Sequence, residues 1–480
     1  MIDQLKATVE FLKSKGVTYG DARYVSTTSE AIKITNETVD SLAQQLDQGF
    51  GVRVLVDGSW GFASSAICSM GEMKKVANRA IQIAKASALT RREPVTLAEL
   101  EPVVGHYETP VATDPLKVSL PQKLNLLSKV NKILRKDSRI HVAESTMDFI
   151  RTKKIFVSTE GSAIEQDLTE SGAGYTVTAI DDGDVQRRSY PNSHRGDWGT
   201  GGYELVERMD LAGNAERVRE EAIALLTAPP CPSGRRTIIL DASQVALQVH
   251  ESCGHPTELD RVLGTEISLA GGSFLTLDKR GSFKYGSDIV TIVGDATAPG
   301  GLGTFGFDDE GVPAQRFDLV RNGLFVGYLT SRETAPVIGQ RSNGTMRADG
   351  WNRVPLIRMT NINLEPGNVS LDDLLADSEG ALFLETNKSW SIDDQRLNFH
   401  FGLEAAWEIR GGRKGQIYKN PLYTGITPEF WNACDAICSR DHWHIWGVPN
   451  CGKGEPMQTS RVAHGASPAR FRNIEVGASQ

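Results

Sequence analysis

The sequence predicts an α+β protein, with a mixed α/β first part and a mainly β second part. Two periodicities support this: helical spacing alternates with strand spacing up to residue 226, whereas strand spacing dominates after one helix near residue 242. Between the two parts, the proline-rich segment TAPPCPSGRR (227–236) cannot continue the preceding helical pattern. At about 100–200 residues per domain, two domains suit this length. We predict an N-terminal domain over 1–231 and a C-terminal domain over 232–480.

The first part alternates helices with half-buried strands. The stretch FGVRVLVDGSWGFAS (50–64) predicts two strands joined at Asp57-Gly58, a dipeptide that favours tight hairpin turns. Segments 139–162 and 172–182 alternate in the same way. The predicted helices are 2–15, 72–88, 121–136 and 204–226.

The second part opens with a short buried strand, TIIL, and one helix. Asp241 suits the N-cap, Gln244 completes a capping box, and Leu240 with Val245 forms a hydrophobic staple, so the helix begins at about Ala242. Strands follow, including a hairpin over 316–330 with Asn322-Gly323 at its tip. The other predicted strands are 354–364, 380–390 and 397–412. The 47 glycines fit a large curved sheet or barrel, or a groove in which a peptide lies against bare backbone.

The net charge and the residue composition argue against several functional classes of protein. A net charge of −8 argues against a nucleic-acid scaffold, and there is no apolar run long enough to span a bilayer. The N-terminal amphipathic pattern lacks the apolar region of a signal peptide, which predicts a cytoplasmic protein. Six cysteines are too few for a disulfide framework, so a functional cysteine is expected to be a metal ligand or nucleophile.

The segment QVHESCGHPTELD holds His250-Glu251-x-x-x-His255, one residue longer than the zinc-hydrolase pattern H-E-x-x-H. At about 100° per residue, positions five apart diverge by about 140° on a regular helix, so the two rings would point apart. Gly254 tolerates unusual backbone angles, and Pro256 is expected to push His255 out of the helical region. A one-residue bulge, or a helix that ends at Gly254, would return the second ring to the first. Glu251 could then take a proton from metal-activated water.

A catalytic zinc needs a third protein ligand. Nearby, Cys253 is expected to be a packed thiol, and Glu258 and Asp260 to be solvated. The distant Cys451 is the better candidate, because it lies in the glycine-rich loop PNCGKGEP, where Lys453 would favour the thiolate. His464 could lie behind the ligands as a hydrogen-bond partner or serve as an oxyanion donor, or could be an ordinary loop histidine.

A competing cluster, CDAICSRDHWHIW, contains Cys434, Cys438, His442 and His444 at a spacing that could bind a structural zinc. We expect core packing there instead. The cysteines would share one face of a helix, and the histidines would share one face of a strand.

The chain resembles the TldD/PmbA family of zinc metalloproteases, also called modulators of DNA gyrase, over almost its full length. The resemblance rests on GFGVRVLVDGSWGFASS, HESCGH, FDDEGVPAQ, GTMRADGWNRVPLIRMTN and the closing NCGKGEP…VAHGASPARFRN. Only the residues after His255, PTELDRVLG, depart from the glycine-rich continuation of the best-known bacterial members. A mixed α/β domain followed by a mainly β domain is also the fold that the resemblance implies.

The resemblance implies one zinc ion held by His250, His255 and Cys451, with Glu251 as the catalytic base. It also implies a homodimer, or a heterodimer with a PmbA-type paralogue that lacks the metal motif. The implied substrates are unfolded or ribosomally made peptides, gripped as an extended strand. Two alternatives stay open: a peptide- or toxin-binding modulator that does not cut, and a metal hydrolase of a non-peptide amide.

Overall fold

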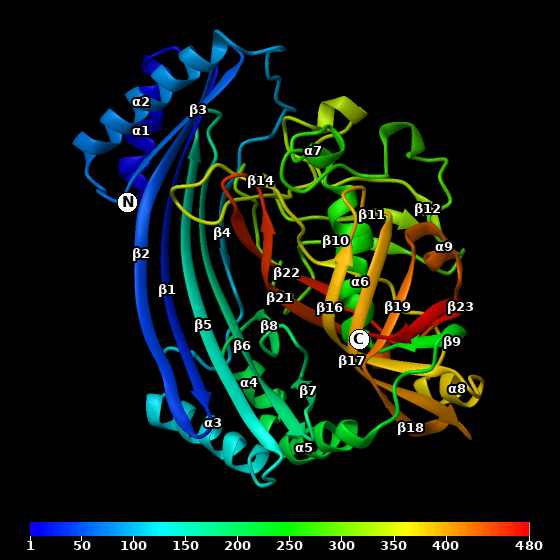
Figure 1. Ribbon diagram of the computed structural model, residues 1–480. Coiled ribbons are helices and arrows are strands. Elements are labelled where there is room, and N and C mark those ends of the chain that lie inside the picture. The colour runs from blue at the N-terminus through cyan, green and yellow to red at the C-terminus, as the bar shows by residue number, and fades with distance from the viewer. Residues whose placement is uncertain (480) are drawn as a thin grey trace.

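The computed structural model describes residues 1–479. It contains both helices and many strands, and its second half is mainly β, so the predicted α+β class is confirmed (Figure 1). Within the described residues, we find no helix that is both long enough and apolar enough to cross a membrane.

The first half is built on an eight-stranded sheet with the order β3-β2-β1-β5-β6-β4, in which β7 and β8 also pair with β6. Figure 1 shows that its central strands are long and curve around the second half of the molecule. The pairing of β4 with β6 is parallel and the others are antiparallel. The strands are β1 Tyr19–Thr35, β2 Thr38–Val56, β3 Ser59–Ser65, β4 Val104–Glu108, β5 Ile140–Ser158, β6 Ala163–Asp181, β7 Asp184–Tyr190 and β8 Asp197–Thr200.

Helices cover the two ends of this sheet and enclose two separate apolar clusters (Figure 1). The helices are α1 Ile2–Ser14, α2 Met70–Ala88, α3 Leu120–Leu134, α4 Glu204–Arg208 and α5 Leu211–Thr227. The single helix predicted over 204–226 is therefore wrong in one respect, because it is broken into α4 and α5. The break lies at Asp210, whose backbone is left-handed (φ +44°) and whose carboxylate caps α5 through the amide of Gly213.

Both predicted hairpin tips are confirmed. Asp57 and Gly58 have φ of +49° and +68°, and Asn322 and Gly323 have φ of +47° and +76°. Positive φ at both central residues is the conformation of the tight turn whose twist matches that of paired strands.

The second half contains a ring of five strands, because β16 pairs with both β9 and β17 and closes the order β16-β9-β23-β19-β17. Of the two interpretations of the many glycines, a barrel-like sheet is thus found. Two further strands extend the ring, and shorter sheets and helices lie around it. The strands are β9 Gly234–Leu240, β10 Ile292–Asp295, β11 Arg316–Arg321, β12 Leu324–Phe325, β13 Met346–Arg347, β14 Leu356–Ile357, β15 Ile362–Leu364, β16 Leu382–Ile392, β17 Asn398–Arg410, β18 Arg413–Lys419, β19 Pro421–Ile426, β20 Cys434–Ile437, β21 His444–Lys453, β22 Gln458–Ala466 and β23 Ala469–Ala478; the helices are α6 Ala242–Val249, α7 Leu259–Val262, α8 Leu371–Ala376 and α9 Thr427–Asn432.

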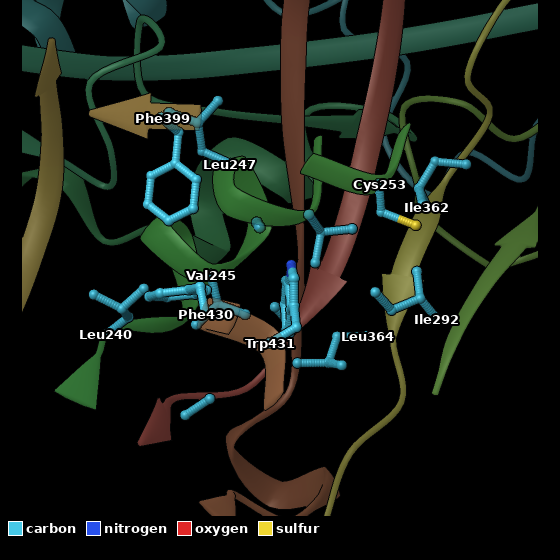
Figure 2. Close-up of a cluster of buried hydrophobic side chains, with 14 of the residues drawn as sticks. Leu240, Val245, Leu247, Cys253, Ile292, Ile362, Leu364, Phe399, Phe430 and Trp431 are labelled. Carbon is cyan, nitrogen blue, oxygen red and sulfur yellow. The ribbon is translucent and has the colours of Figure 1, made fainter. Parts of the chain in front are cut away.

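Helix α6 is the central element of this half, and every residue of it except Ser243 is buried. Figure 2 shows Val245 and Leu247 packed among apolar side chains from the surrounding strands. Asp241 caps the helix through the amides of Ser243 and Gln244, as predicted. The Gln244 side chain does not return to the cap; it donates to the Tyr423 hydroxyl (2.8 Å), which in turn donates to Gln248 (2.8 Å). These buried hydrogen bonds fix the rotation of the helix inside its apolar surroundings.

A polar contact joins the first sheet to strand β21. Asp197, the first residue of β8, accepts from the Gly447 amide (3.1 Å) and lies 2.6 Å from the Nε2 atom of His444. Burial opposes protonation of His444, but the hydrogen bond and the charge of Asp197 raise its pKa above the ordinary value. The contact therefore favours the folded state while the imidazole is protonated.

The His444–Asp197 contact should make stability depend on pH. Because the folded-state pKa is raised, the contribution is complete below the unfolded value of about 6.5 and is lost as the pH rises through the folded value. Half of the His444 side chain is exposed, so we expect a loss below about 1 kcal/mol. Chemical denaturation of the protein and its His444→Gln variant across this pH window measures it. An identical pH profile in the two proteins would contradict the assignment.

Candidate metal centre

The H-E-x-x-x-H segment continues α6 as a π-helical turn, η1 His250–Gly254, followed by a 3₁₀ turn, η2 His255–Thr257. The His255 amide donates to the His250 carbonyl, five residues earlier. A π turn contains one residue more than an α turn, so positions five apart come to lie on one face. The ring centroids of His250 and His255 are 4.9 Å apart. Of the two predicted geometries, the bulge is therefore found.

The expected effect of Pro256 is wrong, because His255 keeps helical angles (φ −60°, ψ −44°). The turn is held instead by the Thr257 hydroxyl, which donates to the carbonyls of Cys253 (2.7 Å) and Gly254 (3.0 Å). Gly254 is required for a different reason from the one predicted. A Cβ atom there would lie 2.1 Å from the Met359 sulfur, so the turn can pack this closely only with glycine.

Cys451 reaches the two histidines from strand β21. Its Sγ atom lies 3.6 Å from the Nε2 atom of His255, although the residues are 196 positions apart. The ligand atoms of His250, His255 and Cys451 all lie within 4.8 Å of one another, and all three residues are buried. Within residues 1–479, no other group of three or more histidine, cysteine or acidic side chains lies close enough together to share one ion.

Hydrogen bonds behind the two rings leave the Nε2 atom of each free. The Ile362 carbonyl can only accept, so the Nδ1 atom of His464 donates to it (3.0 Å), and the Nε2 atom of His464 accepts from the Nδ1 atom of His250 (2.7 Å). The Nδ1 atom of His255 lies 3.1 Å from the Glu258 carboxylate. Burial lowers the pKa of His250 and of His464, which keeps both imidazoles neutral. Neutral imidazole is the form that binds a metal.

Glu258 and Asp260 are not the solvated side chains that we predicted. Glu258 is fully buried and also accepts from Arg261 (3.1 Å). Burial would raise its pKa, but Lys453 and His255 hold that pKa well below the usual range. Asp260 pairs with the ammonium group of Lys453 at 2.7 Å and 2.9 Å. The sequence signal that was missed is the spacing His255-x-x-Glu258, which places a carboxylate one turn after the imidazole.

The Cys451 thiol has a lowered pKa, although not through Lys453 as expected. Burial raises this pKa, and the proximity of His255 and of the Arg358 guanidinium outweighs that effect. The Lys453 ammonium group is occupied by Asp260 and by the Ile357 carbonyl (2.8 Å). Arg358 also donates to the Cys451 carbonyl at 2.5 Å, so it holds the backbone as well as favouring the thiolate.

The donor set fits zinc. Two imidazole nitrogens and one thiolate are ligands that zinc prefers, and three protein ligands leave one position for substrate or water. With usual zinc–ligand lengths, a nitrogen and a sulfur on a regular tetrahedron are about 3.6 Å apart, as His255 and Cys451 are here. Glu251 lies next to His250, is buried, and has the Arg396 guanidinium 3.7 Å from its carboxylate.

The other cysteines lie apart from this centre. Cys253 is packed among apolar side chains near Ile292 and Ile362 (Figure 2), as expected. Cys434 and Cys438 are buried in apolar clusters too, and burial raises the pKa of the Cys438 thiol to about 11. Two details of that prediction are wrong, since Cys434 begins strand β20 and does not lie on a helix, and His442 ends a 3₁₀ turn outside strand β21. His442 accepts from the Leu371 amide (3.2 Å).

Known proteins similar over most of the chain are named as metalloproteases. A metalloprotease of Methanocaldococcus jannaschii is 29% identical over 420 residues, which cover 87% of this chain and 89% of the relative. A zinc metalloprotease TldD homolog of Saccharolobus solfataricus is 22% identical, covering 96% and 97% of the two chains. A Thermotoga maritima protein described as a modulator of a DNA gyrase has the same fold, with a TM-score of 0.78, 18% identity and 99% of both chains covered.

The family models that match most of this chain describe one class of protein, the metallopeptidases. The sequence of the chain matches PmbA/TldA metallopeptidase domain 1 over 20–84, the central domain over 113–226 and the C-terminal domain over 233–478. The chain belongs to the PmbA/TldD metallopeptidase family.

Replacement of Cys451 should remove the metal. In Cys451→Ala, only two imidazole ligands remain, so we expect the bound metal per chain to fall to a small fraction of its original value. Elemental analysis of the purified proteins after dialysis measures this. Cys253→Ala is the matched control, because that thiol lies between the two histidines in the sequence but packs in the core, and this variant should keep its metal. Equal metal in Cys451→Ala and the unaltered protein would exclude Cys451 as a ligand.

Replacement of His464 should weaken metal binding without removing a ligand. His464→Phe fills the same buried space but cannot accept from His250, so that ring loses its orientation. Loss of such a partner typically costs about 10–100-fold in metal affinity. Competition with a chromophoric chelator gives the affinity, and circular dichroism checks that the variant is folded. An unchanged affinity in a folded variant would show that His464 has no such role.

Proposed function

We propose that this chain is a zinc-dependent peptidase of unfolded or ribosomally made peptides, with Glu251 as its general base. The observation that carries the proposal is the buried convergence of two imidazoles and one thiol of lowered pKa, beside the buried carboxylate of Glu251. A zinc ion held by His250, His255 and Cys451 would activate water and polarise the scissile carbonyl.

Side chains of the protein transfer the protons and orient the two imidazole rings. Glu251 accepts the proton of the attacking water and then delivers a proton to the leaving amine. His464 and Glu258 fix the tautomers of the two rings through their Nδ1 atoms. Low local polarity strengthens each of these interactions, because the groups are buried.

An extended peptide is the substrate form that we propose. Main-chain hydrogen bonds to a strand edge grip a peptide with little dependence on its side chains, and they require that the peptide be unfolded. Cys451 itself lies in a two-stranded sheet, β21 paired with β22, which supports this mode of docking next to the ligands.

Glu251→Gln tests the assignment of the general base. The amide keeps the size of the side chain but cannot accept a proton, so we expect cleavage of unfolded peptides to fall by about 10²–10⁴-fold. Metal content and peptide binding should be retained. The assays are mass spectrometry of peptide digests, elemental analysis and fluorescence anisotropy of a labelled peptide.

The same assays distinguish the proposed peptidase from a peptide-binding modulator and from a hydrolase of non-peptide amides. Peptide binding without cleavage by either protein would favour a modulator that does not cut. Cleavage of small amides without cleavage of peptides would favour a different hydrolase. Either result would overturn the proposed substrate class.

A further inference from the structure

Glu251 has an unusual environment for a buried carboxylate. It is 5% exposed. Its ion pair is with Arg396, whose Nη1 atom lies 3.7 Å from Oε2. A buried charge without a counter-charge is strongly unfavourable. At 3.7 Å the guanidinium supplies that counter-charge but is too far away to occupy the carboxylate lone pairs as a hydrogen-bond donor.

Arg396 lies in the turn between β16 and β17, far from Glu251 in the sequence, and its backbone is left-handed (φ +61°). The turn is held by several hydrogen bonds: the Arg396 amide donates to Asp393 (2.9 Å), and the Phe274 amide donates to Gln395 (2.8 Å). Gly271 lets the turn lie directly on the neighbouring loop, because a Cβ atom there would be 2.3 Å from the Asp394 carbonyl. Non-glycine residues in this conformation persist where their surroundings enforce it, often at functional sites.

The guanidinium is anchored at one end. Its Nη2 atom donates to the Ala270 carbonyl (3.3 Å), which also accepts from Arg261 (2.9 Å). The buried Nε atom has no hydrogen-bond partner among the described residues. Arg261 in turn binds Glu258, so the two arginines connect the loop at Ala270 with the carboxylates of Glu251 and Glu258.

We propose that Arg396 is a positioning residue for the peptidase reaction, which holds the Glu251 carboxylate in place without occupying its lone pairs. The inference rests on the proposed function of Glu251. Arg396 acts through Glu251, so its removal lowers the rate of the chemical step and leaves metal binding and peptide binding as they were.

The left-handed backbone provides a variant that separates this role from folding. Arg396→Gly removes the guanidinium and places the residue that best tolerates φ +61° at this position, so the Tm should not fall through backbone strain. We expect kcat to fall by about tenfold or more, KM to change by less than about threefold, and the metal content to stay unchanged. Arg396→Lys keeps a cation and should recover part of kcat. Gln395→Ala, in the same turn, is the matched control and should behave like the unaltered protein.

Peptide affinity decides between positioning and direct substrate contact. On the Glu251→Gln background, addition of Arg396→Gly should leave the Kd for a labelled peptide unchanged. A weaker Kd would assign Arg396 to substrate binding and overturn the proposal, as would an unchanged kcat in Arg396→Gly. Cleavage by the unaltered protein distinguishes these failures from that of the proposed function, because a protein that cleaves no peptide would remove both.

Discussion

The metal centre depends on the buried ion pair between Lys453 and Asp260. These residues are 193 positions apart, and their contact joins strand β21 to the segment that follows the histidine pair. Two residues before Lys453, the same strand presents Cys451 to His255. Removal of one partner of a buried ion pair typically costs about 3–5 kcal/mol, since the other charge is left without compensation. The pair therefore does more than contribute stability: it sets the position from which the thiol meets the imidazoles.

The π turn solves a geometric problem that a regular α-helix cannot. Helix α6 enters the site fixed by its cap at Asp241 and by the hydrogen bonds of two glutamines to Tyr423. One additional residue in the following turn then rotates His255 onto the same face as His250. Because Gly254 packs tightly against Met359, position 254 of this turn has no room for a side chain larger than that of glycine. The rigid helix α6 thus fixes the position of the segment, and the irregular turn sets the orientation of the two imidazole rings.

The charged groups around the centre lie close to groups of opposite charge. Burial favours the neutral forms of His250 and His464, and the Nδ1 atoms of His250 and His255 are both engaged, while Glu258 stays ionised through Lys453 and His255. Arg358 favours the Cys451 thiolate, and Arg396 lies beside Glu251. Each buried charge in this group thus has an opposite charge nearby, which is the condition under which charged groups persist in an interior of low polarity.

Local patterns in the sequence determined the α+β class, the cap at Asp241 and the hairpin tips at Asp57-Gly58 and Asn322-Gly323, because these depend on residues next to one another in the chain. Residue chemistry and family resemblance also singled out His250, His255, Cys451, Glu251 and His464. Only the tertiary structure decided that Glu258 is buried behind His255, that Arg358 and not Lys453 acts on the thiol, and that Arg396 faces Glu251. The physical reason is that the burial and the electrostatic environment of a side chain depend on segments that are far apart in the chain. The packing of the whole fold brings these segments together, and a local sequence pattern contains no information about it.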